Sequence, residues 1–184
     1  MATALLLMDF QATTLGAVGG HECPALERAS VAANAARAAG IDVIFVRVAW
    51  RPGLPEVRLD NPAFAALAEY GEAFDENGPG TQVHAKLGRR PGEPVVVKRR
   101  ISAFASDLAE VLRGRGIDHL VLGGIVTSGV VVSTVRYACD QDYKLTVLSD
   151  ACADPDPVLH DALMNRLFPQ QATVISVDDW AAKL

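Results

Sequence analysis

The chain reads DHLVLGGIVTSGVVVSTVRYACDQD over residues 118–142. Residues 118–122 are mostly apolar, as in a buried strand, and Gly123-Gly124 let the backbone turn tightly after them. Residues 128–142 are then expected to form a helix. A strand, a glycine turn and a helix in this order form the repeating unit of a parallel α/β sheet.

The same alternation of apolar runs and amphipathic stretches extends in both directions along the chain. Further strands are expected at residues 4–8, 41–48, 94–98, 144–148 and 173–177. Further helices are expected at residues 25–39, 62–70, 106–115 and 157–168, and the rest of residues 50–92 forms an irregular flap over one end of the sheet. Because strands this apolar are buried on both faces, the sequence predicts a single α/β domain over residues 1–184. Its predicted architecture is a Rossmann-like, three-layer fold with a six-stranded, mostly parallel sheet flanked by helices.

Composition narrows the classes of function. Half of the 184 residues are hydrophobic, which suits one well-buried domain. The net charge is −5 and no basic run is longer than residues 98–100, which argues against a nucleic-acid partner. No apolar stretch is long enough to cross a membrane, and residues 1–8 are better explained as a first strand than as a signal peptide. Three cysteines without a CxxC pair are typical of a reducing compartment, so we expect a cytoplasmic protein.

Charged residues and glycines follow three of the predicted strands. Asp9 follows the first strand, Lys98 ends the third, and the loop at residues 123–130 follows the fourth. Open parallel sheets bind ligands beyond the carboxyl ends of their strands, so we expect these groups to meet there. A carboxylate beside a lysine in a partly dry pocket can act as a general acid or base. The alternative is a structural ion pair at the rim of the sheet.

The loop itself offers backbone donors. The N–H groups of Val126, Thr127, Ser128, Gly129 and Val130 precede or begin a helix, a geometry suited to an oxyanion or carboxylate. The alternative is an ordinary strand-to-helix turn in which Ser128 caps the helix.

Four further residues are pocket candidates because they follow the first two strands. Phe10 and Trp50 could line an apolar pocket or belong to the core, Gln11 lies beside Asp9, and Arg51 could bind a carboxylate. No histidines stand at ligand spacing, so we expect no metal and no cofactor.

Three stretches resemble the isochorismatase-like hydrolases, also called the cysteine hydrolase superfamily. They are residues 5–11 (LLLMDFQ), 95–104 (VVVKRRISAF) and 124–136 (GIVTSGVVVSTVR). The resemblance implies a six-stranded parallel sheet, with Asp9 and Lys98 as the catalytic aspartate and lysine. It also implies an oxyanion hole made by loop N–H groups and a cis peptide bond before the nucleophile, here expected at Val126-Thr127.

The family's nucleophilic cysteine aligns with Val130, which has no nucleophilic atom. The usual covalent route is therefore closed. Cys139 and Cys152 are expected to be packing residues, and Ser128 is expected to be a cap. Cys23, near His21 in the loop after the first strand, could overhang the site, although a surface loop is the simpler explanation.

Two functions fit these residues. The first is a family hydrolase of a small molecule that lacks the cysteine and uses Asp9 as the acid and water as the nucleophile, as in vinyl-ether hydrolysis. The alternative is a catalytically inactive member that binds a small molecule or a protein. Either form is expected to take a small-molecule ligand and to assemble as a homo-oligomer, a dimer or a tetramer, without nucleic acid or membrane.

Overall fold

The computed structural model describes residues 2–184, so Met1 of the predicted first strand lies outside the described residues. Its centre is one six-stranded sheet in the order β3-β2-β1-β4-β5-β6, and every neighbouring pair is parallel. The predicted α/β class is confirmed, with a sheet that is parallel throughout. The strands are β1 (Ala2–Met8), β2 (Asp42–Val48), β3 (Val95–Lys98), β4 (Ile117–Ile125), β5 (Lys144–Ala153) and β6 (Thr173–Ile175).

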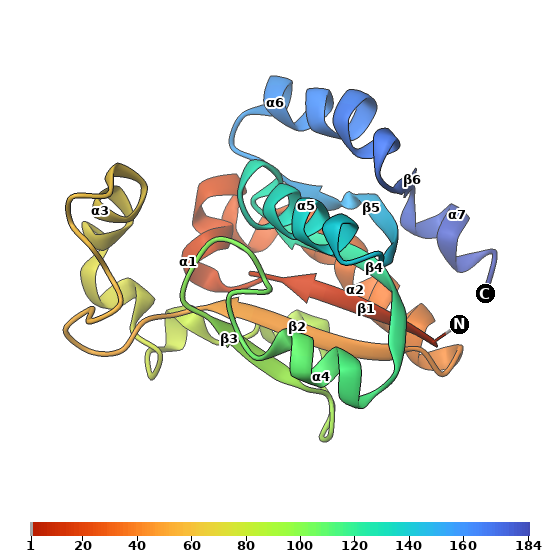
Figure 1. The fold of residues 1–184 in the computed structure, drawn as a ribbon, viewed down its shortest axis with the longest axis horizontal. Helices are drawn as coiled ribbons and strands as arrows, with labels where there is room; N and C mark the ends of the chain where they lie inside the picture. The colour runs from red at the N-terminus through yellow and green to blue at the C-terminus, as the bar shows by residue number, and fades with distance from the viewer. Residues whose placement is uncertain (1) are drawn as a thin grey trace.

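Helices cover both faces of the sheet (Figure 1). The alanine-rich helix α2 (Pro24–Ala38) and the C-terminal helix α7 (Val177–Ala181) pack on one face. Helices α4 (Leu108–Gly114) and α5 (Val132–Asp140) pack on the other, together with α6 (Pro157–Ala162) and the helical turns that follow it. The sheet therefore separates two apolar cores, which explains why its central strands carry large aliphatic side chains on both faces.

The chain reverses its winding direction at β1. This strand pairs with β2 on one side and with β4 on the other, and Met8 lies beside both Val46 and Gly124. Ligand sites in open α/β sheets lie at such a reversal, beyond the carboxyl ends of the strands. The residues that follow Met8 and Ile125 are therefore placed at the expected position of a site.

Two glycines assigned to a turn in the sequence belong instead to β4. Gly123 and Gly124 have no positive φ, and the strand continues to Ile125. A Cβ atom on Gly124 would lie 3.1 Å from a methyl carbon of Val131 and 3.2 Å from Met8. These glycines therefore allow close packing of β4 against its neighbours, and the prediction that they form the turn was wrong.

Other boundaries also differ from the sequence predictions. The helix after β4 begins with one turn of π-helix at Thr127–Val131, capped by the extended Val126 without a side-chain bond, so Ser128 is not its cap. The last predicted strand ends at Ile175 because Ser176 caps α7, accepting a hydrogen bond from Asp179 N–H. A short helix, α1 (Ala12–Leu15), was not expected.

Residues 51–92 form the flap that was expected from the sequence. Helix α3 (Pro62–Ala68) lies within it, capped by Asn61, and short helical turns follow. Figure 1 shows α3 beyond the carboxyl ends of β1 and β2. A bridge between Trp50 and Asp75 joins the start of the flap to its middle. Within residues 2–184, no helix combines the length and the hydropathy that a membrane span needs.

Candidate functional site

Asp9 and Lys98 meet at the carboxyl end of the sheet. Lys98 Nζ lies 2.9 Å from Asp9 Oδ2, and the two residues are only 2% and 4% exposed. The lysine ends β3 and reaches across β2, while Asp9 follows β1 with a left-handed φ of 59° that aspartate tolerates better than most residues. Lys98 also donates to the carbonyl oxygen of Arg100 at 3.0 Å. The predicted juxtaposition of the two charges is therefore present.

The carboxyl group of Asp9 is only half satisfied. Its Oδ1 atom is buried and has no hydrogen-bond partner among the described residues. Burial raises the pKa of Asp9 from 3.8 to about 6, although the charge and the hydrogen bond of Lys98 pull it downward. Asp9 can therefore hold or release a proton close to neutral pH, as a general acid or base must.

Asp9 and Lys98 border a cavity of about 200 Å³. Most of its lining is apolar and comes from the strand ends, the flap and the loop after β4: Val48, Trp50, Phe64, Leu67, Phe74, Ile101, Ile125, Val126 and Gly129. Thr14 and Arg100 are the remaining polar residues on it. The Thr14 hydroxyl donates to the backbone carbonyls of Asp9 and Gln11, so it is already engaged. No cysteine lines this cavity in the described part of the chain.

Of the four predicted pocket residues, only Trp50 lies on the cavity. Its indole N–H donates to the carbonyl oxygen of Arg99, and its ring packs against Phe64 and Phe74. Phe10 is buried in the core that packs against α2. Gln11 is also buried, because its side-chain amide bonds to both backbone groups of Val48.

Arg51 lies away from the cavity as well. It pairs with Glu56 at the surface and borders a separate depression of the flap. Besides Lys98, the cation that reaches the cavity is Arg100, which the sequence did not single out. Its only signal was its position two residues after Lys98, within a basic run that was considered for nucleic-acid binding alone.

The loop after β4 offers fewer free backbone N–H donors to a ligand than predicted. Ser128 N–H donates to Asp154 Oδ2 at 2.6 Å, and Gly129 N–H donates to the carbonyl oxygen of Val126 at 3.0 Å. At least two of the five predicted donors are therefore engaged within the protein. Val130 is 2% exposed and belongs to the core that packs against α4 and α5. A cis peptide bond is present at Ile125-Val126, one bond earlier than predicted, where β4 ends.

The cysteines lie elsewhere. Cys23 and Cys152 border a second, more open cavity of about 730 Å³ beside α2 and the end of β5, and Cys139 is half-buried on α5. Burial raises the pKa of the Cys152 thiol to about 12, which keeps it protonated and unreactive. His21 contacts His84, with 2.7 Å between Nδ1 and Nε2, and borders neither cavity. Within residues 2–184, no group of three or more histidine, cysteine or acidic residues is arranged to hold a metal ion.

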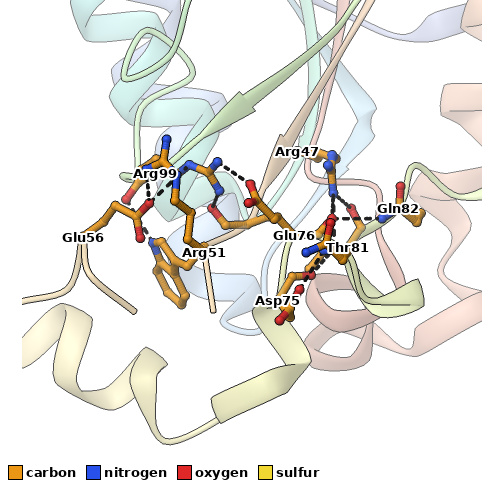
Figure 2. A network of polar contacts seen from close by, with 11 residues as sticks. Arg47, Arg51, Glu56, Asp75, Glu76, Thr81, Gln82 and Arg99 are labelled. Carbon is orange, nitrogen blue, oxygen red and sulfur yellow. Dashed lines mark hydrogen bonds and ion pairs between the residues drawn. The ribbon is translucent and has the colours of Figure 1, made fainter. Parts of the chain in front are cut away.

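Arginine side chains join the flap to the sheet (Figure 2). Arg99, which follows β3, pairs with Glu76 and lies 3.8 Å from Glu56, and it also donates to the carbonyl oxygen of Ala49. Arg47 of β2 donates to the carbonyl oxygens of Glu76 and Thr81. These contacts place the flap residues Phe64, Leu67 and Phe74 over the cavity.

Comparison with known proteins shows similarity along nearly the whole chain. Residues 3–179 match the isochorismatase domain. The isochorismatase family protein YecD of Escherichia coli O157:H7 is 34% identical over 180 residues, which cover 96% of this chain and 93% of that protein. The ureidoacrylate amidohydrolase RutB of Pseudomonas savastanoi pv. phaseolicola is 34% identical over 203 residues, covering 97% and 82%. The solved structure of an isochorismatase family protein from Burkholderia thailandensis superposes with a TM-score of 0.82 at 28% identity, covering 100% of this chain and 96% of that one.

Proposed function

The chain belongs to the isochorismatase family of hydrolases, and we propose that it hydrolyses a small molecule by acid catalysis, with Asp9 as the proton donor. The observation that carries this proposal is the environment of Asp9. Its side chain is buried, is paired with Lys98 and borders an apolar cavity. The pKa of Asp9 is raised to about 6. A carboxyl group with this pKa is half protonated at pH 6 and roughly one-tenth protonated at pH 7. The acid form is therefore available under mild conditions.

A vinyl ether is the substrate chemistry that suits this group. Asp9 transfers its proton to the terminal alkene carbon, and the ether oxygen stabilises the resulting cation. Water adds to the cationic carbon and loses a proton, which returns to the Asp9 carboxylate. The hemiketal then separates into a carbonyl compound and an alcohol. In this scheme Lys98 stabilises the Asp9 carboxylate after proton transfer.

The scheme requires no protein nucleophile, in agreement with the side chains around the cavity. The sequence motif supports Val130 as the residue at the position of the family's cysteine, and no thiol lines the cavity within residues 2–184. The relatives similar in sequence include ureidoacrylate amidohydrolases. For an amide, the same Asp9 carboxylate would act as a base toward water, and the dependence of rate on pH would then be reversed.

Turnover of a panel of small vinyl ethers and amides tests the proposal. We expect hydrolysis of a vinyl ether by the wild-type protein and its loss in Asp9→Asn, which keeps the shape of the side chain but cannot supply the proton. The matched control is Asp118→Asn, because Asp118 is exposed at the opposite end of β4. A rate that survives in Asp9→Asn would refute the acid role. A panel without any turnover would favour the inactive, ligand-binding alternative.

The assignment of Val130 has its own test. In Val130→Cys, the thiol introduced at this position is expected to react with iodoacetamide faster than Cys23, Cys139 or Cys152, because the resemblance aligns it with the reactive cysteine of the family. The rates are compared in one protein by mass spectrometry of the alkylated peptides. An introduced thiol that reacts no faster than the native three would contradict the assignment.

A further inference from the structure

Arg100 is the only cation on the apolar cavity that has no carboxylate partner in the described part of the chain. Lys98, the other cation, is paired with Asp9. The guanidinium carbon of Arg100 lies 4.8 Å from the centre of the Phe64 ring, and its Nη1 donates to the carbonyl oxygen of Arg99 at 2.9 Å. A cation held over an aromatic face is oriented without losing its charge. The Arg100 side chain is therefore positioned beside the cavity with most of its N–H donors unused.

The neighbouring arginines differ in this respect. Figure 2 shows Arg51 paired with Glu56 and Arg99 paired with Glu76 and close to Glu56, while Arg47 donates to oxygens of the flap. Each of these arginines has a structural partner, and none of them lines the cavity. An arginine on a ligand cavity without such a partner is suited to an anion supplied by the ligand.

The charge balance of the cavity points in the same direction. When Asp9 is ionised, it neutralises Lys98 and leaves Arg100 as the excess charge. When Asp9 holds the proton that it donates in the proposed reaction, Lys98 and Arg100 are two cations with no anion on the cavity wall. A ligand with a negative charge would compensate them and would favour the protonated form of Asp9.

We propose that Arg100 determines specificity by binding a carboxylate on the substrate, while the apolar part of the substrate fills the cavity beside Asp9. A guanidinium can bind a carboxylate through two parallel hydrogen bonds. The cavity, at about 200 Å³, is smaller than the roughly 300–1,000 Å³ of sites for drug-sized molecules. The expected ligand is therefore a single ring, or a molecule of similar size, with one carboxylate. The inference deepens the proposed function and rests on it for the reaction.

Binding of two probes of the same shape tests this inference. Cyclohex-1-ene-1-carboxylate and cyclohex-1-ene-1-carboxamide differ in charge, and neither contains a vinyl ether, so no turnover is required. Calorimetric titration of the wild-type protein should show at least about fivefold tighter binding of the carboxylate, which is the order expected for one charge-assisted contact near solvent. Arg100→Gln should remove that preference, and Arg100→Lys should restore part of it.

Arg136→Gln is the matched control. Arg136 is an exposed arginine of α5 that does not line the cavity, so its replacement changes the net charge equally. Equal affinity of the wild type for both probes, failure of the carboxylate to bind, or an unchanged preference in Arg100→Gln would each overturn the inference. Equal losses in Arg100→Gln and Arg136→Gln would also overturn it, because the effect would then be one of overall charge.

The inference and the proposed function fail separately. In Asp9→Asn, turnover should be absent while the carboxylate still binds more tightly than the carboxamide. If the wild type prefers the carboxylate but hydrolyses no vinyl ether, the acid catalysis is wrong and the binding role of Arg100 stands. If it hydrolyses uncharged vinyl ethers as well as carboxylated ones and Arg100→Gln leaves KM unchanged, the inference about Arg100 is wrong.

Discussion

Asp9 has two oxygens in different environments, one bonded to Lys98 and the other buried without a partner among the described residues. Because burial opposes ionisation and Lys98 favours it, the two effects can be separated by changing one of them. We predict that Asp9 titrates near pH 6 in the wild-type protein and at a higher pH in Lys98→Met, in which burial remains but the positive charge is gone. The Cγ chemical shift of Asp9 in labelled protein measures both midpoints. A wild-type midpoint near 4, or a lower midpoint in Lys98→Met, would contradict this explanation.

For individual residues, the sequence correctly predicted the positions of the two charged side chains, Asp9 and Lys98, but it predicted few of the residues that line the cavity. Asp9 and Lys98 were identifiable because a charge directly after an apolar strand must lie at the edge of a sheet. Position after a strand did not determine where the other side chains point. Phe10 lies in the core and Arg51 pairs within the flap, whereas Arg100 reaches the cavity only because the chain after β3 turns toward Phe64.

The end of β4 depends on close packing at Gly124. Adding a methyl group there would crowd Val131 and Met8, so Gly124→Ala should lower the free energy of unfolding by about 1–3 kcal/mol. Gly114→Ala, in α4 with open space around it, should be neutral or should raise the free energy by about 0.5–1 kcal/mol. Urea unfolding of both variants provides the comparison. Equal effects at the two positions would show that Gly124 is not required for packing.

A side chain that follows β5 holds the loop after β4 in place. Asp154 accepts the Ser128 N–H bond, whereas Asp156, two residues later, caps α6 by accepting bonds from Val158 and Leu159. We predict that Asp154→Ala accelerates hydrogen exchange at the Ser128 amide and that Asp156→Ala does so only at the two helix amides. Each variant should cost about 1 kcal/mol of stability. Unchanged exchange at Ser128 in Asp154→Ala would show that this bond does not hold the loop.

Sequence patterns predicted which helices and strands are present better than they predicted the residues at which these elements begin and end. Apolar runs located all six strands, but Gly123 and Gly124 were assigned to a turn because glycine has the same appearance in a turn and in a crowded strand. Ser128 resembled a cap, yet its N–H group is bound by a carboxylate 26 residues away in the chain. Such long-range partners are absent from any local pattern.

The flap is joined to the sheet by side-chain contacts, and those of Arg99 are among them. Arg99 links Glu76, Glu56 and Ala49, so Arg99→Gln should loosen residues 51–92 without unfolding the sheet. We predict faster proteolytic cleavage within the flap and a nearly unchanged midpoint of global unfolding. Arg51→Gln is the control, because its pair with Glu56 is at the surface and should contribute little. Equal cleavage rates in Arg99→Gln and the wild type would contradict the linking role of Arg99.

Over the whole molecule, the alternation of strands and helices was sufficient to predict the three layers, and the strand order placed the site at the reversal beside β1. The order of the strands and the path of the flap over the cavity depend on contacts between distant residues, such as Trp50 with Phe74 and Arg99 with Glu76. The apolar roof of the cavity was therefore not predictable from local sequence.

The dependence of kcat/KM on pH, measured with the vinyl ether that is hydrolysed fastest, tests the proposed role of Asp9 most directly. Because the protonated carboxyl group is the proposed reactant and its pKa is about 6, kcat/KM should be constant at low pH and fall about tenfold per pH unit above 6. The Asp9→Asn protein should show no turnover at any pH in this range. A rate that rises through pH 6 to a plateau would contradict the proposal and indicate that Asp9 acts as a base.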